Sequence, residues 1–393
     1  MKTQSYKMEE ALESIIDYRG KTPNKATVGI PTLSAKSVKK GFIDYSECYY
    51  ISPEEYERFM VRGFPHKGDI LLTTEAPMGM VAKLDRDDVA IAQRLLTLRG
   101  KKGVLDNDFL MYYLQSPIGQ AKLAERETGS TVTGIKQAEF RKITIDIPDI
   151  DTQKKIAYVI SGLDERISIN KSINKNLEEQ AQCIFKKMFL DKAKDRKHCR
   201  ADELFDISIG KTPPRKEKEW FSENPDDVVW VSISDMGTSG AFISDSSEYI
   251  TSSAVDRFNV RVVPDRTVIL SFKLTVGRVA ITDGRLTTNE AIAHFKTKDD
   301  LITEYLYCYL SRFDYSSLGS TSSIATAVNS KLIKGMEFIV PEKEEETEFH
   351  DMVSPMFMAI RDNLRENKRL LKIKDYIIPR VLMGKYDLEK LSL

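Results

Sequence analysis

The sequence predicts an α+β protein with an internal pseudo-twofold repeat, in which two globular domains of mixed α/β structure are separated by two long helices packed as a coiled coil. Three observations predict this fold class. A long helical pattern occurs twice, asparagine pairs interrupt both copies at matching places, and short motifs precede each copy in the same order. Repetition of this kind indicates a chain built from two similar halves.

The two long helices are expected at residues 151–190 and about 344–385. In each, apolar or small residues recur with gaps that alternate between three and four, the spacing of a coiled-coil seam. The first seam is Ile160, Leu163, Ile167, Leu177, Ala181, Ile184 and Met188, interrupted by Asn170 and Asn174. The second lies 193 positions later and is Val353, Met356, Ile360, Leu370, Lys374, Ile377 and Val381, interrupted by Asn363 and Asn367.

The asparagines are expected to set the register of the helix pair, because a buried Asn is costly unless it meets a hydrogen-bonding partner. In an antiparallel pair Asn170 faces Asn367 and Asn174 faces Asn363. The same register brings Leu163 opposite Lys374, its one unfavourable pair. A parallel pair also joins Asn to Asn, so the seam alone leaves the direction open. A simpler interpretation, two ordinary amphipathic surface helices, also stays open.

The composition is that of a soluble globular protein, with 393 residues, 41% hydrophobic and 30% charged. That length suits two or three domains. We expect a cytoplasmic protein without a membrane partner, since no apolar run is long enough to span a bilayer and the N-terminus lacks the core of a signal peptide. The formal net charge is zero, which argues against a nucleic-acid binder as a first interpretation but permits a basic groove.

The first domain is expected at residues 1–150, followed by the first spacer helix at 151–192. A helical pattern runs from Met8 to Ile16. Short strand-like runs follow at 29–33, 41–43, 69–73 and 80–84, then a helix at 108–115 and a strand at 141–148. The second domain, 193–342, repeats this order before the second spacer helix and C-terminal tail at 343–393.

No catalytic, cofactor-binding or metal site is expected in this chain. Gly20-Lys21-Thr22 and Gly210-Lys211-Thr212 resemble the end of a phosphate-binding loop, but Ile15 and Phe205 stand where that motif needs glycine. The four Cys and four His show no metal-ligand spacing. No dinucleotide fingerprint or methyltransferase motif is present.

Polar residues in the loops suit recognition of DNA instead, because base edges and phosphates are bound by cations, amides and hydroxyls. The candidates in the first domain are Lys36, Ser37, Lys39, Lys40, Thr73, Thr74, Gln93, Arg94, Ser130, Thr131, Thr133 and Lys136. Those in the second are Arg215, Lys216, Lys218, Ser234, Ser271, Lys273, Arg278, Asn289, Ser320, Thr321, Ser322 and Ser323. Any one of them taken alone is more simply a solvated loop residue.

Several motifs resemble the specificity (S) subunit of type I restriction–modification enzymes. They are residues 18–23 (YRGKTP), 69–73 (DILLT) with 76–79 (APMG), the Gly129-Ser130-Thr131 loop before a strand and Pro148, the helix at 156–190, and the ending 378–384 (IPRVLMG). The resemblance covers nearly the whole chain. The second half departs from it, with Lys273-Leu274-Thr275-Val276 where the first has Glu75-Ala76-Pro77-Met78.

The resemblance implies a DNA-specificity subunit without an active site of its own. Each domain would read one half of a bipartite double-stranded DNA target. The two long helices would pack as an antiparallel coiled coil and form a spacer that docks two modification (methyltransferase) subunits. S-adenosylmethionine would be bound by those subunits, and ATP and Mg²⁺ by restriction (translocase and nuclease) subunits. The alternatives are a self-contained DNA methyltransferase or nuclease, and a non-catalytic scaffold that binds other proteins.

Overall fold

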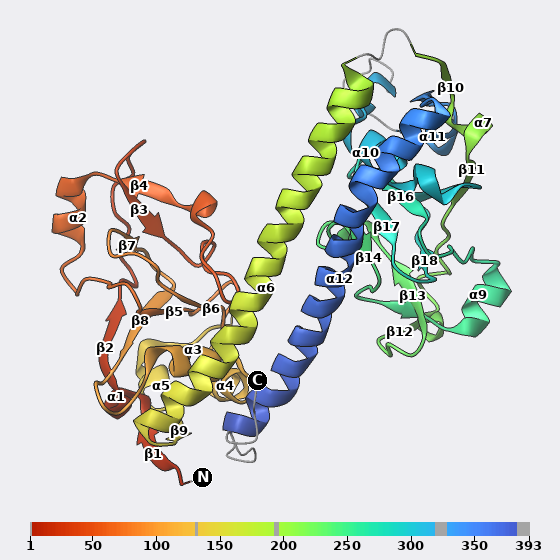
Figure 1. Cartoon of the computed structure of the whole chain (residues 1–393). Coiled ribbons are helices and arrows are strands. Elements are labelled where there is room, and N and C mark those ends of the chain that lie inside the picture. The colour runs from red at the N-terminus through yellow and green to blue at the C-terminus, as the bar shows by residue number, and fades with distance from the viewer. Residues whose placement is uncertain (1, 130–132, 192–195, 319–327, 383–393) are drawn as a thin grey trace. The chain divides into compact units, whose positions relative to one another are not determined.

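The computed structural model describes residues 2–129, 133–191, 196–318 and 328–382 (Figure 1). The chain divides into two compact units, unit 1 with residues 1–166 and 369–393, and unit 2 with residues 167–368. Helix α6 (Ile150–Phe185), continued by a π-helical turn at Lys186–Leu190, contributes to both units, as does helix α12 (Lys343–Leu382). The two long helices predicted from the seam are therefore confirmed.

The described residues of unit 1 form three sheets. Their strand orders are β2-β8-β5-β6, β4-β3-β7 and β1-β9. Its elements are β1 (Gln4–Lys7), α1 (Met8–Ala11), β2 (Leu12–Asp17), β3 (Ile30–Leu33), β4 (Tyr49–Ile51), α2 (Pro53–Phe59), β5 (Ile70–Thr73), β6 (Val81–Lys83), β7 (Ala90–Ile91), β8 (Leu95–Gly100), α3 (Asn107–Gln115), α4 (Pro117–Ala124), α5 (Gln137–Arg141) and β9 (Thr144–Ile147).

Unit 2 repeats this sheet arrangement, with orders β11-β19-β16-β17-β14, β12-β15-β13-β18 and β10-β20. Its elements are β10 (His198–Arg200), α7 (Ala201–Leu204), β11 (Asp206–Ile209), β12 (Phe221–Ser222), β13 (Val228–Val231), α8 (Ile233–Met236), β14 (Phe242–Ile243), β15 (Tyr249–Ile250), α9 (Ser252–Phe258), β16 (Val268–Ser271), β17 (Val279–Thr282), β18 (Thr287–Thr288), β19 (Ile292–Lys296), α10 (Thr303–Arg312), α11 (Ser330–Lys334) and β20 (Glu337–Ile339).

Every strand pairing of unit 1 recurs in unit 2, which adds β14 parallel to β17 and β12 antiparallel to β15. In unit 1, β8 lies antiparallel between β2 and β5, and β3 pairs with β4 antiparallel and with β7 in parallel. In unit 2, β19 lies between β11 and β16, and β13 pairs with β15 antiparallel and with β18 in parallel. The internal repeat predicted from the motif order is therefore a repeat of sheet topology.

The helical pattern predicted at Met8–Ile16 is wrong beyond Ala11. Only Met8–Ala11 is helical, and Leu12–Asp17 forms strand β2, which pairs antiparallel with β8. Ile15 and Ile16 are β-branched and fit a strand better than a helix. The hydrogen bonds of a neighbouring strand therefore outweigh a helical pattern that is too short to be stable by itself.

The long helices form part of each hydrophobic core. In unit 1, Ile156 and Ile160 of α6 and Ile377 of α12 belong to one cluster with Phe109 and Leu110 of α3. Gln153 is fully buried and joins the start of α6 to the domain, because its amide nitrogen donates to Val104 O and to Pro148 O, both at 2.8 Å. In unit 2, a matching cluster joins Phe185, Val353 and Ile360 to Tyr305 and Leu306 of α10.

The asparagine pairs lie in unit 2 and establish the antiparallel register there. Asn170 Nδ2 donates to Asn367 Oδ1 at 2.9 Å, and Asn363 Nδ2 donates to Asn174 Oδ1 at 2.8 Å. In unit 1 Lys374, the unfavourable partner of the predicted register, donates to Asp164 and lies 5.4 Å from the centre of the Tyr112 ring. A neighbouring acid and an aromatic face thus accommodate the lysine in the seam.

Ion pairs attach α12 to the second domain. Arg361 donates to Asp283 at 2.7 Å and to Asp265 at 2.9 Å, and Arg365 donates to Asp283 at 2.6 Å. Burial alone would raise the pKa of Asp283, but the hydrogen bonds from Arg365 and Arg361 outweigh it and hold that pKa below its ordinary value. The carboxylate form is therefore favoured at this contact.

Candidate nucleic-acid interface

A hairpin loop closed by a side-chain hydroxyl occurs at the same place in each domain. We call this hydroxyl, with the two backbone hydrogen bonds that it makes across the loop, the clasp. We call residues 74–79, between β5 and β6, the first tip loop, and residues 272–277, between β16 and β17, the second tip loop. The hydroxyl of Thr73 donates to Pro77 O at 2.6 Å and accepts from Met80 N at 2.9 Å. The hydroxyl of Ser271 does the same in the second domain, donating to Thr275 O at 2.6 Å and accepting from Arg278 N at 3.0 Å.

The backbones of the two tip loops match as well. Gly79 N donates to Thr73 O and Gly277 N donates to Ser271 O, both at 3.0 Å. Gly79 has a φ of +86° and Gly277 a φ of +93°, and Ala76 and Leu274 also have positive φ, at +52° and +59°. Positive φ is uncommon for residues other than glycine, so its recurrence at the same loop position indicates that both domains form the same specific loop conformation.

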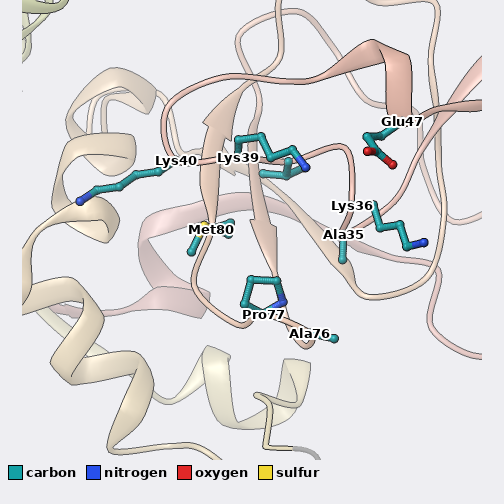
Figure 2. A pocket seen from close by; sticks show the side chains of 9 residues that line it. Ala35, Lys36, Lys39, Lys40, Glu47, Ala76, Pro77 and Met80 are labelled. Carbon is teal, nitrogen blue, oxygen red and sulfur yellow. The ribbon is translucent and has the colours of Figure 1, made fainter. Parts of the chain in front are cut away.

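Three lysines border one side of the first tip loop. A depression of about 400 Å³ is lined by Ala76, Pro77 and Met80 together with Ala35, Lys36, Val38, Lys39, Lys40 and Glu47. Figure 2 shows the side chains of Lys36 and Lys39 directed to the side on which Glu47 lies, and that of Lys40 extending the other way. This edge of the domain therefore offers ammonium groups in two directions beside the loop.

A second depression, of about 220 Å³, also includes a residue of the first tip loop and is lined by Arg19, Glu75, Thr128, Gly129, Gly134 and Lys136. The Glu75 carboxylate lies 3.2 Å from Arg19 Nη2 and 3.5 Å from Arg94 Nε. Arg19 also donates to Thr74 Oγ1 at 3.3 Å and to Ile135 O at 3.2 Å. These contacts hold Glu75 at the base of the loop with 27% of its side chain exposed.

The second domain has a depression of about 530 Å³, lined by Arg215, Lys218, Phe221, Ser222, Glu223, Ser247 and Glu248. Arg215 donates to both carboxylate oxygens of Glu248, at 2.8 and 2.6 Å. Its guanidinium also lies 4.3 Å from the ring centre of Phe221 and 4.5 Å from that of Trp230. Arg215 is thus fixed by a carboxylate and two aromatic faces, while Lys218 is exposed.

Glu290 lies near the second tip loop. Burial favours a raised pKa for Glu290, but the hydrogen bond from Thr212 and the positive charges of Lys273 and Arg215 outweigh it, so this pKa lies below its ordinary value. Arg278, at the end of the loop, donates to Ile233 O at 2.6 Å. The cations predicted in this domain therefore have different roles, since Arg278 supports the backbone whereas Lys273 is exposed.

The candidate residues fall into four groups by position. Exposed ones are Lys36, Lys40, Gln93, Arg94, Thr133, Lys136, Arg215, Lys216, Lys218, Ser234 and Lys273. Lys39, Arg278 and Asn289 are half-buried, and Ser37, Thr73, Thr74 and Ser271 are buried. Ser130, Thr131, Ser320, Thr321, Ser322 and Ser323 lie outside the described residues.

The hydroxyls of the buried candidates bond within the protein. Thr73 and Ser271 clasp the tip loops, as described above, and Ser37 Oγ accepts from Ser34 N at 3.3 Å. Half-buried Asn289 accepts from Ala291 N at 3.1 Å through its side chain. These residues position the loops that carry the exposed candidates.

Sequence reasoning missed three residues of the tip loops and their surroundings, Arg19, Glu75 and Leu274. Leu274 is 99% exposed at the second tip loop, although leucine is usually buried. The available signal was the mismatch between Glu75-Ala76 and Lys273-Leu274, at places where the flanking residues of the two halves agree.

The described residues contain no group of three or more His, Cys, Asp or Glu side chains placed to hold a metal ion. His294 is buried between Ser208 Oγ at 3.1 Å and Thr288 Oγ1 at 2.7 Å, and burial lowers its pKa to about 3. Across the same described residues, no helix is both long and apolar enough to cross a bilayer.

Comparison with known protein families identifies the family of the repeated unit. The family model described as the type I restriction modification DNA specificity domain matches residues 9–179 and again residues 194–371. The chain belongs to this family. It is a specificity subunit of a type I restriction–modification system, with two target-recognition domains, and is non-catalytic; in this family the catalytic activities lie in partner subunits.

Relatives of the specificity family cover most of the chain. The HindI specificity subunit of Haemophilus influenzae is 23% identical over 400 residues, covering 81% of this chain and 86% of that protein. The MjaIX specificity subunit of Methanocaldococcus jannaschii is 26% identical over 370 residues, covering 87% and 82%. A crystal structure of the S subunit from M. genitalium covers 97% of this chain and 96% of that chain with a TM-score of 0.59 and 14% identity, which supports the fold.

Proposed function

We propose that each domain of this specificity subunit reads one half of a bipartite double-stranded DNA target through the major groove. The observation that carries the proposal is the clasped tip loop that recurs in both domains, since two equivalent loops suit two separate half-targets. Lysine side chains beside the first tip loop, and the arginine and lysine in the depression of the second domain, would bind phosphates and set the position of each domain on the duplex.

We also propose which parts of the chain serve each role. Residues 1–150 and 193–342 would be the recognition domains, and residues 151–192 and 343–393 the spacer helices with the C-terminal tail. The starts of α6 at Ile150 and of α12 at Lys343 support these boundaries. The exposed candidates would contact DNA directly, whereas the clasp residues Thr73 and Ser271 would act by positioning.

The proposed partners follow from the family. Two modification subunits, which bind S-adenosylmethionine, would dock on the spacer helices and methylate adenine in the target. Restriction subunits that use ATP and Mg²⁺ would join them for translocation and cleavage. The complex would act in the cytoplasm, where it meets its DNA.

Methylation sequencing tests this proposal. The chain, co-expressed with the modification subunit of its own system in a host that lacks DNA methyltransferases, should produce one methylated motif with two defined parts and an unread gap. The purified chain alone should neither methylate nor cleave DNA. Methyl transfer by the chain alone would favour the self-contained enzyme, and the absence of any motif in a complex that assembles would favour the scaffold.

Exchange of one domain tests the division of labour. Replacing residues 1–150 by the equivalent domain of another specificity subunit should change one part of the motif and leave the other part intact. A change in both parts would contradict independent reading by the two domains. Replacing residues 193–342 in the same way is the matched control, and it should alter the other part alone.

A further inference from the structure

The two tip loops carry opposite charges at the same position. Thr73 pairs with Leu95 in the first domain and Ser271 pairs with Ile292 in the second, so these residues are equivalent. Counting forward from Thr73 and Ser271, Glu75 and Lys273 occupy the same place in their loops. A carboxylate in one domain thus corresponds to an ammonium in the other.

The neighbouring turn carries the complementary exchange. Counting back from Leu95 and Ile292 makes Arg94 equivalent to Ala291, and Gln93 equivalent to Glu290. In the first domain the acid lies on the tip loop and the cation on the turn before β8. In the second domain the cation lies on the tip loop and the acid on the turn before β19. Each domain therefore has one acidic and one cationic side chain at this edge. The acidic side chain lies on the tip loop in the first domain and on the neighbouring turn in the second.

A common scaffold presents these different side chains. The hydroxyl clasp, the glycine hydrogen bond and the positive φ at the third loop residue are shared, as described above. A loop fixed in this way loses little conformational entropy when it binds, so its side chains can discriminate between ligands. A loop geometry shared by both domains, combined with opposite charges at the same loop position, is the pattern expected of a recognition loop whose ligand differs between the domains.

The apolar residue after Lys273 supports a DNA base as that ligand. Leu274 is 99% exposed and has a φ of +59°, so it is unfavourable both in solvation and in backbone conformation. Ala76 holds the equivalent place, also with positive φ and also exposed. An apolar group beside a cation matches the major-groove edge, where the thymine methyl lies among hydrogen-bonding groups.

Cations line two separate depressions, and the first tip loop contributes residues to both of them. Lys36, Lys39 and Lys40 border one depression and Lys136 the other. In a major groove, phosphates run along both edges and bases lie between them. The loop that contributes residues to both basic depressions is therefore suited to reach the bases while the neighbouring cations bind phosphates.

We propose that the tip loops read bases at equivalent places in the two half-targets, with Glu75 selecting a base that presents an amino group and Lys273 selecting guanine beside a thymine whose methyl contacts Leu274. Carboxylates accept from the amino groups of cytosine and adenine, whereas lysine donates to guanine O6 and N7. A carboxylate has about four acceptor sites, so the contacts of Glu75 with Arg19 and Arg94 leave capacity for a base. This inference rests on the function proposed above.

Neutral variants of the assembled complex test the charged positions. Duplexes that carry the methylated motif, with each base pair of the half-targets replaced in turn, should show that Glu75→Gln lowers discrimination at one position of one half-target by about tenfold. Lys273→Gln should do the same at one guanine of the other half-target. Tenfold is within the range that one good base contact provides. Lys218→Gln is the matched control, because it removes the same charge from the same domain beside a depression; it should weaken all duplexes equally.

A base analogue tests Leu274 without depending on any variant. Replacing the relevant thymine by uracil removes only the methyl group, and the wild-type complex should then bind about fourfold more weakly, as expected for one buried methyl-sized group. Leu274→Ala should bind the thymine and uracil duplexes equally. A second half-target without thymine, or a wild-type complex indifferent to uracil at every thymine, overturns the Leu274 contact.

The outcomes separate this inference from the proposed function. If the wild-type complex methylates no defined motif, the proposed function fails. If a motif is defined, and Glu75→Gln and Lys273→Gln bind every substituted duplex with unchanged ratios, the tip loops do not read bases although the proposed function stands. Loss of discrimination at several positions together would show a structural role for these side chains and also overturns the inference.

Discussion

Replacing all four seam asparagines, Asn170, Asn174, Asn363 and Asn367, by leucine should leave the melting temperature unchanged or raise it. Each pair makes only one hydrogen bond between its two side chains. Asn170 Oδ1 and Asn174 Nδ2 are buried and have no hydrogen-bond partner within the described chain. Each such atom costs about 1–3 kcal/mol, whereas each hydrogen bond between asparagines contributes about 1 kcal/mol and the bond from Asn170 Nδ2 to the Glu366 carboxylate, at 2.7 Å, about 1.5–3 kcal/mol. These contributions nearly cancel, so the layer as a whole adds little stability to the fold.

The single variants should behave differently from the quadruple variant. Asn363→Leu removes the hydrogen bond that Asn174 Oδ1 accepts and leaves this amide, whose Nδ2 also has no partner within the described chain, against an apolar group, at a cost of about 1–3 kcal/mol. Asn174→Leu added to it should restore most of that loss. The coupling free energy of this double-mutant cycle is therefore expected to be about 1–3 kcal/mol.

The assay combines urea unfolding, which measures the free energy of unfolding of each variant, with light scattering, which measures the oligomeric state. The quadruple variant should populate additional oligomers, because a leucine seam no longer favours one register. A clear fall in melting temperature without additional oligomers would refute the reasoning, since the asparagines would then stabilise the helix pair rather than specify it.

Four further outcomes are expected. Seven helical residues inserted after Ser168 and seven after Lys368 should lengthen the unread gap of the methylated motif by about three base pairs without changing the bases read. The reason is that seven residues add roughly 10 Å of helix and one base pair rises about 3.4 Å. An unchanged gap would contradict the spacer role. Burial lowers the pKa of His294 to about 3, so protonation of this side chain favours the unfolded chain. The free energy of unfolding should therefore fall by about 1.4 kcal/mol per pH unit as the pH drops below about 6.5 towards 3. His294→Gln should flatten this slope in a urea titration, and a slope that persists in the variant would count against the buried neutral histidine. Gln153→Leu removes three hydrogen bonds and should destabilise unit 1 by on the order of 3 kcal/mol in calorimetry, so a loss below about 1 kcal/mol would contradict its anchoring role. Thr73→Val keeps the shape of the side chain but removes the clasp, and should weaken binding of the specific duplex more than that of a random duplex of equal length; equal weakening would argue against a positioning role.

The helices and the repeat could be predicted because their signals are local and occur twice. A seam of alternating three and four residues is readable without tertiary information, and the second copy served as an internal check on the first. The strand at Leu12–Asp17 could not be predicted in the same way. Its conformation depends on hydrogen bonds to β8, whose paired residues lie 79 to 88 positions later in the chain, and not on its own pattern.

The candidate interface was predictable by residue type but not by exposure. Lys36, Lys136 and Lys218 line the depressions as expected of cations. Thr73 and Ser271 have the chemistry of DNA contacts, yet their hydroxyls bond within their own loops, which only three-dimensional geometry reveals. Glu75 was passed over because a search for cations, amides and hydroxyls excludes carboxylates.

The pairing of β1 with β9 and of β10 with β20 means that the chain enters and leaves each domain through adjacent strands. β1 and β9 are joined over four residue pairs, from Gln4 with Ile147 to Lys7 with Thr144, and β10 and β20 over three. A foreign domain inserted between such strands must preserve only this short ladder and its packing on the helix. If each domain reads its own half-target, as proposed, recombination at two points within one gene would create a new DNA target in a single genetic event without disturbing the rest of the assembly.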